Sequence, residues 1–204
     1  MKILYCIRHG YAMHNNLFKY IGTKAYTEFR DTNLLNEGIF QAKRLNKTWK
    51  NIDDVELIIV SPCSRTLETA KFIFKDKNIP MISKDFLIEY PMGSHICNRR
   101  KNIEDLKTLH PTINFNHIEN NILTWPNEKE TIFELNDRID EMLDWVFKRS
   151  ETTIAVISHS SFIGQFKDNI IGDEANELKY CYPYKIELNY DENKKFLSIK
   201  EVKD

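Results

Sequence analysis

Three short apolar runs, each followed at once by polar residues, constrain this chain most strongly. The runs occupy residues 3–7, 57–60 and 154–157. Runs this short are typical of strands that are buried on both faces of a sheet. Between them, apolar residues recur at spacings of three and four over residues 35–52 and 132–146, and a further helix is expected to begin near Ser64. Alternating strands and helices predict parallel βαβ units in an α/β fold.

Polar clusters at the ends of these runs carry the candidate chemistry. They read RHG at residues 8–10, SPCSR at 61–65 and SHS at 158–160. Ligands of open α/β sheets bind at the carboxyl ends of the strands. The sequence therefore predicts that Arg8, His9, Arg65 and His159 meet at one rim of the sheet.

Two guanidinium groups beside a histidine indicate a phosphate site. Arginine presents a planar fork of donors that matches phosphate oxygens, and its charge persists at physiological pH. With a phosphate between Arg8 and Arg65, His9 is placed to attack phosphorus and to hold a covalent phosphoryl group. Gly10 allows the backbone to turn sharply beside the ligand.

Composition excludes several other classes of protein. Lys and Arg total 29 against 30 for Asp and Glu, so the net charge of -1 gives no electrostatic case for nucleic acid or an anionic membrane. The first apolar run is too short for a signal peptide or a membrane span, which predicts a cytoplasmic protein.

Cysteine spacing and short motifs narrow the chemistry further. The four cysteines are dispersed, without Cys-x-x-Cys spacing, and are expected to be reduced packing residues. None is followed by an arginine six positions later, as a thiolate phosphatase would need. Neither His-Glu-x-x-His nor Gly-x4-Gly-Lys is present, so no metal and no cofactor are expected.

Four ordered blocks of the sequence resemble the histidine phosphatase superfamily, the phosphoglycerate-mutase-like proteins. The blocks are RHGYAMHN at 8–15, LLNEGIFQA at 34–42, SPCSRTLETA at 61–70 and VISHSSF at 156–162. They are similar to the family patterns R-H-G-x-x-x-x-N, L-T-x-x-G-x-x-Q-A, S-P-x-x-R-T-x-x-T-A and V-x-S-H-G-G-F. EYPMGSHICNRRK, DLKTLHPTINF and LTWPNEKETIFEL resemble the plant and fungal branch more loosely. Four blocks in the family order are far more specific than one Arg-His-Gly.

The resemblance implies a fold and a set of residue roles. The fold is a three-layer α/β/α sandwich with a mixed, mainly parallel sheet, as one domain over residues 1–204 with a cap insertion at about 88–130. His9 is the implied nucleophile and Glu89 the implied proton donor to the leaving oxygen. The residues implied to hold the phosphoryl group are Arg8, Asn15, Arg65 and His159.

The chain departs from the family pattern at four positions. Tyr11 stands where the family often has Glu or Gln, Leu35 where it has Thr, and Ser160 and Ser161 where it has a glycine pair. None of these changes removes a charge-bearing catalytic position. Because Tyr11 differs from the family residue, a substrate contact of the family at this position is not assigned to this chain.

Substrate specificity is expected to lie in the cap and in a loop over residues 17–30. Arg99 and Arg100 of the cap, and Gly22 of the loop, are candidate substrate contacts, although a basic pair that opens a helix is more often a solvated face. The remaining histidines are expected in surface or loop positions: His14, His95, His110 and His117.

Metal-independent hydrolysis of a phosphate monoester is the activity that these features favour. The substrate is expected to be a small phosphorylated molecule or a phosphoprotein. A phosphoglycerate-type mutase uses the same pocket and stays open as an alternative. A non-catalytic binder of phosphorylated partners is the third possibility, and the intact set of Arg8, His9, Arg65 and His159 argues against it. The sequence does not indicate an oligomeric state.

Overall fold

A mixed six-stranded sheet runs through the part of the chain that the computed structural model describes, residues 1–118, 125–169, 178–190 and 196–202. Its order is β3-β2-β4-β1-β5-β6. The neighbouring pairs from β3 to β1 are parallel, β5 is antiparallel to β1, and β6 is antiparallel to β5. The strands are β1 Lys2–Arg8, β2 Leu57–Val60, β3 Met81–Ser83, β4 Thr153–Ser158, β5 Pro183–Tyr190 and β6 Phe196–Val202.

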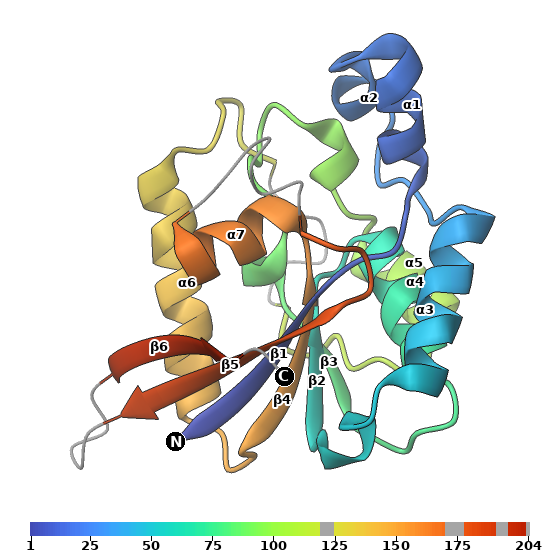
Figure 1. Ribbon diagram of the computed structural model, residues 1–204. Helices are drawn as coiled ribbons and strands as arrows, with labels where there is room; N and C mark the ends of the chain where they lie inside the picture. Colours follow the sequence, from blue (N-terminus) through green and yellow to red (C-terminus); the bar gives the residue numbers. More distant parts are fainter. Residues whose placement is uncertain (119–124, 170–177, 191–195, 203–204) are drawn as a thin grey trace.

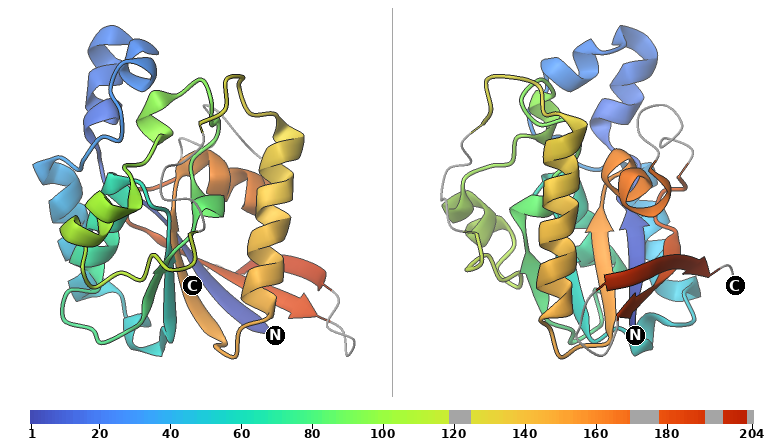
Figure 2. Two further views of the ribbon diagram at one scale, coloured as in Figure 1. Left: turned by 180° about the vertical axis from the view of Figure 1, so that it is seen from behind. Right: turned by 90° about the vertical axis from the view of Figure 1, so that its left-hand side faces the viewer.

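Helices cover both faces of this sheet, so the expected three-layer α/β/α architecture is confirmed. α3, α4 and α5 lie on one side, and α6 and α7 lie on the other (Figures 1 and 2). α1 and α2 rise above the rim where the parallel strands end (Figure 1). The helices are α1 Met13–Ile21, α2 Lys24–Thr27, α3 Asn36–Thr48, α4 Ser64–Ile73, α5 Ile103–Leu109, α6 Ile132–Phe147 and α7 Ser160–Asp168.

The central strands divide their side chains between two separate cores. In β1, Tyr5 and Ile7 pack with α3 and α4, while Leu4 and Cys6 pack with α6 and α7. Successive side chains of a strand point to opposite faces, so a strand that is covered on both sides is apolar throughout. This explains why the strands appear in the sequence as continuous apolar runs.

Helix α3 ends earlier than the apolar periodicity predicts. The periodic pattern runs to Ile52, but the helix ends at Thr48 and Trp49 has an extended backbone. The Trp49 ring packs edge-on against Tyr5, with centroids 5.0 Å apart, and against Phe74 at 5.9 Å. Both Trp49 and Ile52 remain in the core. The apolar spacing therefore continues past the end of the helix because these residues are buried, although they are not helical.

The loop expected over residues 17–30 is mostly helical. α1 and α2 occupy most of it, and Gly22, at φ +58°, ends α1 by donating its N–H to the Phe18 carbonyl. The spacing of His14, Leu17 and Ile21 is the sequence signal for α1. At the other end of the chain, residues 184–202 alternate in the way that is typical of one or two edge strands around a turn at 191–193, and β5 and β6 confirm these strands. Their predicted turn at residues 191–193 lies outside the described residues.

The segment expected as a cap divides into two parts with different surroundings. Cys97 and Asn98 are buried beside the rim, whereas Ile103, Leu106 and Phe115 belong to the core between α4 and the sheet. The short helix α5 therefore contributes to the core rather than to a lid. All four cysteines are free and buried, as expected of packing residues.

Two glycines bring the Arg-His-Gly turn against α3. A Cβ added to Gly10 would lie 2.6 Å from the Gly38 carbonyl oxygen, and one added to Gly38 would overlap the Tyr11 backbone. Both positions therefore need glycine because the two segments of backbone touch directly.

We predict that Gly38→Ala destabilises the protein by about 1–3 kcal/mol, because the added methyl group forces the Tyr11 backbone away from α3. Asn36→Ala, at an exposed position of the same helix, is the matched control and is expected to change stability by less than about 0.5 kcal/mol. Urea unfolding of both variants measures the difference. Equal stabilities would contradict the close packing.

Candidate functional site

Strand register brings the four predicted charged and imidazole groups to one rim. Arg8 lies opposite Ser158 in the parallel pairing of β1 with β4. His9 and His159, one residue further on, have ring centroids 5.2 Å apart. Arg65 is the second residue of α4, which begins shortly after β2 ends, and β2 is the strand on the other side of β4. The rim predicted from the sequence is therefore present.

His9 is held in the form that a nucleophile needs. Its Nδ1 lies 2.7 Å from the Gly10 carbonyl oxygen. A carbonyl oxygen only accepts, so Nδ1 carries the proton and Nε2 keeps its lone pair. Burial, and then the charge of Arg65, hold the pKa of His9 well below its usual range. The imidazole is therefore neutral and nucleophilic near neutral pH.

Arg65 is buried and aimed by the segment that follows Glu89. Its guanidinium donates from Nη1 to the Cys97 carbonyl at 2.8 Å and from Nη2 to Asn98 Oδ1 at 2.9 Å, while its Nε has no partner among the described residues. Asn98 in turn donates to the Pro91 carbonyl at 3.1 Å. Asn98, which the sequence analysis missed, therefore positions Arg65.

Arg8 is held from the opposite side by the segment before β5. Nη1 donates to the Leu178 carbonyl at 2.8 Å and Nη2 to the Tyr180 hydroxyl at 3.0 Å. The guanidinium carbon lies 3.9 Å from the centre of the Tyr180 ring, a close cation–π contact. No short motif marks Tyr180, so sequence reasoning missed it.

His159 stands at the start of α7 with one ring nitrogen bonded. Nε2 lies 2.8 Å from Ser61 Oγ, while the buried Nδ1 has no partner among the described residues. Burial is the main cause that holds the pKa of His159 well below its usual range.

Glu89 lies against the amino end of the same helix. Its carboxylate accepts the backbone N–H of Ser161 at 3.2 Å and of Phe162 at 3.0 Å, and Ser160 Oγ at 3.3 Å. Burial is the largest influence and raises the pKa of Glu89 above its ordinary value, while the backbone bonds to Tyr90 and Ser161 oppose it. A raised pKa increases the protonated fraction that can act as an acid.

A cavity of about 450 Å³ opens beside His9 and Glu89. Arg8, Arg65 and His159 are almost completely buried and do not line it. Its lining consists of His9, His14, Asn15, Phe18, Thr23, Tyr26, Glu89, Tyr90, Pro91, His95, Cys97, Asn98, Lys129, Ser160 and Ser161.

Asn15 lines this cavity in an orientation set by its own helix. Its Oδ1 accepts the Ala12 N–H at 3.0 Å, at the start of α1. The bond uses only the acceptor end of the amide, which leaves the Nδ2 end as the part that suits a phosphate oxygen.

The three candidate substrate contacts do not line the cavity. Arg100 is completely buried, and its Nε and Nη2 donate to the two carboxylate oxygens of Asp85 at 2.7 and 2.9 Å, so it is committed to the fold. Arg99 lines a different hollow together with Lys101. Gly22 lies at the end of α1, and only its neighbour Thr23 reaches the cavity.

His14 was expected at the surface, and this expectation is wrong. Its side chain is buried, its Nδ1 lies 2.6 Å from Thr32 Oγ1, and its ring centroid is 5.7 Å from that of His9. His95, also expected in a surface or loop position, does lie in a loop, where it lines the cavity and packs against Tyr26. Amphipathic spacing in residues 14–21 is the signal that could have placed His14 on an inward face.

Two absences hold for the described ranges of the chain. No group of three His, Cys, Asp or Glu side chains there is arranged to hold a metal ion. Nor does any helix within those ranges have the length and apolar character needed to cross a membrane.

Comparison with known proteins identifies the family. The model of the histidine phosphatase superfamily (branch 1) matches residues 4–192. The chain therefore belongs to the histidine phosphatase superfamily, which confirms the prediction from the four ordered motifs. The prediction of an enzyme of the histidine phosphatase type is confirmed at the level of this family.

Curated relatives come from a plant and from fungi, in agreement with the looser resemblance to the plant and fungal branch. A phosphoglycerate mutase-like protein of Arabidopsis thaliana is 27% identical over 220 residues, covering 87% of this chain and 78% of that protein. A probable phosphoglycerate mutase of Arthroderma benhamiae is 30% identical over 196 residues. That match covers 83% of this chain but only 58% of the fungal protein.

Solved structures share the fold at low sequence identity. The ecdysone phosphate phosphatase of Bombix mori, in complex with tungstate, matches with a TM-score of 0.64 and 15% identity, covering 100% of this chain and 93% of that one. The mycobacterial glucosyl-3-phosphoglycerate phosphatase matches with a TM-score of 0.62 and 13% identity, covering 99% and 97%.

We predict that stability falls as pH decreases through the usual histidine range. His9, His14 and His159 have pKa values held well below 6.5 in the folded chain, so below that pH the unfolded chain binds protons that the native state does not. Each such histidine adds a slope that approaches about 1.4 kcal/mol per pH unit. The free energy of unfolding from urea titrations between about pH 7.5 and 5.5 should therefore decrease steeply.

His14→Asn removes one histidine that takes up a proton only on unfolding. The dependence of the unfolding free energy on pH should therefore become shallower by about the contribution of one histidine. His117→Asn, at an exposed position, is the control and should change the slope less. A slope that His14→Asn leaves unaltered would contradict the buried, neutral state of His14.

Proposed function

We propose that this protein is a phosphatase that hydrolyses a phosphate monoester through a phosphohistidine on His9. The observation that carries the proposal is the neutral His9, with its Nδ1 proton bonded to the Gly10 carbonyl and two buried arginines beside it. A nucleophile needs this lone pair, and developing charge on phosphoryl oxygens needs fixed cations.

In the first step, His9 Nε2 attacks phosphorus and the bond from phosphorus to the leaving oxygen breaks. Glu89, in its protonated form, gives its proton to that oxygen. Arg8 and Arg65 neutralise the equatorial oxygens, and the Asn15 amide and His159 add hydrogen bonds. Phosphoryl transfer depends mainly on positioning and charge stabilisation, which this set supplies without a metal.

In the second step, water attacks the phosphohistidine and the bond between nitrogen and phosphorus breaks. Glu89 is now a carboxylate and takes a proton from the attacking water, which restores its acid form. His9 regains its lone pair, and inorganic phosphate leaves. The same carboxyl group acts as acid in the first half-reaction and as base in the second.

The walls of the cavity favour a small phosphorylated molecule as the substrate. Phe18 stacks on Tyr26 with ring centroids 5.1 Å apart, and Tyr26 lies 5.0 Å from His95. Of the described residues that line the cavity, Lys129 is the one lysine or arginine. Such walls suit a leaving group with an apolar surface, and a phosphatase of small esters fits them better than a binder of long phosphoprotein segments.

A phosphoglycerate-type mutase is the second candidate, and the names of the plant and fungal relatives favour it. A mutase returns the phosphoryl group to a second oxygen of a bound sugar acid and must exclude water while it does so. Incubation with 3-phosphoglycerate, with and without a bisphosphoglycerate primer, separates the two activities. Isomerisation that requires primer and releases no phosphate would overturn the phosphatase proposal.

We predict that phosphate release from p-nitrophenyl phosphate in the presence of chelator persists in the wild type and falls at least about 1,000-fold in His9→Ala. His117→Ala, at an exposed position, is the control and should retain wild-type rates. Background rates for the wild type, with tight binding of a phosphoprotein, would support the non-catalytic alternative instead.

We also predict a bell-shaped dependence of kcat/KM on pH. The rate should fall at high pH as Glu89 loses its proton, at a pKa raised above the ordinary value, and at low pH as His9 gains one, at a pKa below 6.5. Glu89→Gln should remove the high-pH limb and lower the rate by about 100-fold or more. The loss should be larger for an alkyl phosphate than for p-nitrophenyl phosphate, because p-nitrophenolate leaves without a proton. An unchanged profile would exclude Glu89 as the acid.

A further inference from the structure

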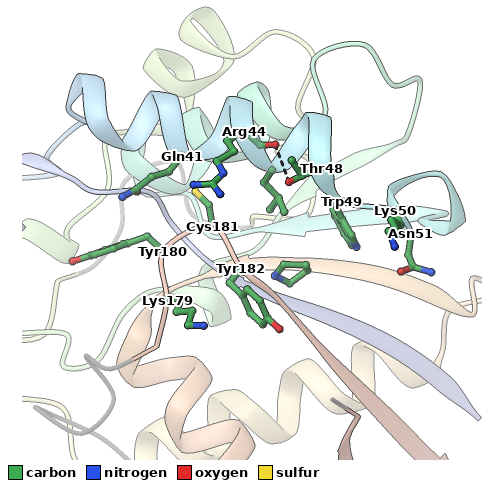
Figure 3. A pocket seen from close by; sticks show the side chains of 12 residues that line it. Gln41, Arg44, Thr48, Trp49, Lys50, Asn51, Lys179, Tyr180, Cys181 and Tyr182 are labelled. Carbon is green, nitrogen blue, oxygen red and sulfur yellow. Dashed lines mark hydrogen bonds between the residues drawn. The ribbon is translucent and has the colours of Figure 1, made fainter. Parts of the chain in front are cut away.

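A second cavity, of about 690 Å³, shares no lining residue with the first. It lies between α3 and the segment that leads into β5. Figure 3 shows Gln41 and Arg44 projecting from α3 on the side that faces the chain carrying Tyr180 and Cys181. Its volume is in the range of small-molecule sites.

The lining of this cavity suits an anion. The described residues that line it include three cations, Arg44, Lys50 and Lys179, and no carboxylate. None of the three forms an ion pair with a described residue. Guanidinium and ammonium groups around one cavity, with no ion-pair partner among the described residues, attract phosphate.

Flat and apolar groups line part of the remaining surface, together with the polar side chains of Gln41, Thr48 and Asn51. Tyr182 is 44% exposed, and Lys179 Nζ lies 5.3 Å from the centre of its ring. The buried side chains of Leu45 and Trp49 add an apolar wall. A ligand that fills this space therefore presents a planar, weakly polar part as well as its charge.

Three hydrogen bonds join the walls of this cavity to the catalytic turn. Tyr180 accepts from Arg8 Nη2 at 3.0 Å, and the Cys181 N–H donates to the Arg8 carbonyl at 2.9 Å. On the α3 side, Gln41 Oε1 accepts the Tyr11 N–H at 2.9 Å. Cys181 has a positive φ of 48°, which a side chain rarely adopts, so the backbone is strained where the cavity meets Arg8.

We propose that this cavity is a second, regulatory site for an organic phosphate that carries a flat ring, of which a nucleoside monophosphate is the simplest case. Occupancy shifts Tyr180, and Tyr180 shifts the guanidinium of Arg8 with which it stacks. The binding half of the proposal is independent of catalysis, and the regulatory half rests on the proposed phosphatase function.

Binding is tested by calorimetric titration of adenosine 5′-monophosphate into the His9→Ala protein, with excess tungstate present to occupy the phosphate site. We expect binding that Arg44→Glu and Lys179→Glu each weaken at least tenfold. Lys47→Glu, on the same helix but outside the cavity, should change the affinity less than twofold. Adenosine and inorganic phosphate, tested separately, should each bind more weakly than the nucleotide.

Two results would overturn the site. One is no binding by the His9→Ala protein up to about 1 mM nucleotide, because a dissociation constant weaker than that corresponds to less than about 4 kcal/mol of binding free energy. The other is binding that tungstate displaces and Arg44→Glu leaves intact, because the nucleotide would then occupy only the cavity beside His9.

Regulation is tested by p-nitrophenyl phosphate hydrolysis with and without the nucleotide. We expect a change in KM of at least threefold in the wild type, none in Arg44→Glu, and a reduced change in Tyr180→Phe, which keeps the cavity but loses the hydroxyl bond to Arg8. An intact binding signal with no effect on KM would reject the regulatory half. Absence of hydrolysis in the wild type would reject the proposed phosphatase function and leave the binding result standing.

Discussion

The direct packing of Gly10 against Gly38 is the constraint on which the rest of the site depends. It places the turn after β1 where other elements can fix it. The Gly10 N–H donates to Thr69 Oγ1 of α4 at 3.0 Å, and the Tyr11 N–H donates to Gln41 of α3. The motifs that contain Gly38 and Thr69 thus supply the contacts that hold the backbone of residues 10–11. This backbone in turn fixes the direction of the neighbouring His9 ring.

Burial then sets the protonation states of the ionisable groups at this rim. A buried arginine keeps its charge, whereas a buried histidine near arginines stays neutral, so one environment yields fixed cations and a free imidazole lone pair. Glu89 responds in the opposite way, because burial favours its protonated form. The same desolvation therefore prepares a neutral nucleophile in His9 and a proton donor in Glu89.

The sequence predicts the parts of this arrangement that depend on local patterns. β1, β2, β4, α4 and α6 follow from apolar runs and periodicity, and the Arg8, His9, Arg65 and His159 rim follows from what ends each strand. β3 escapes detection because its three residues are too few for a pattern. Tyr180 and Asn98 escape because their roles are set by contacts distant in sequence: Tyr180 lies 172 residues from Arg8. Arg100 is misread because a basic pair in the sequence carries no sign that Arg100 is buried and pairs with Asp85.

Rapid-quench labelling of the enzyme is the most direct test of the central claim. Wild-type protein mixed with a phosphate monoester labelled in its phosphoryl group, and stopped within one turnover, should carry an acid-labile, base-stable label on Nε2 of His9, found by peptide mapping. Glu89→Gln should leave the site of labelling unchanged. Phosphate release without a label on His9, or a label on another residue, would contradict the account.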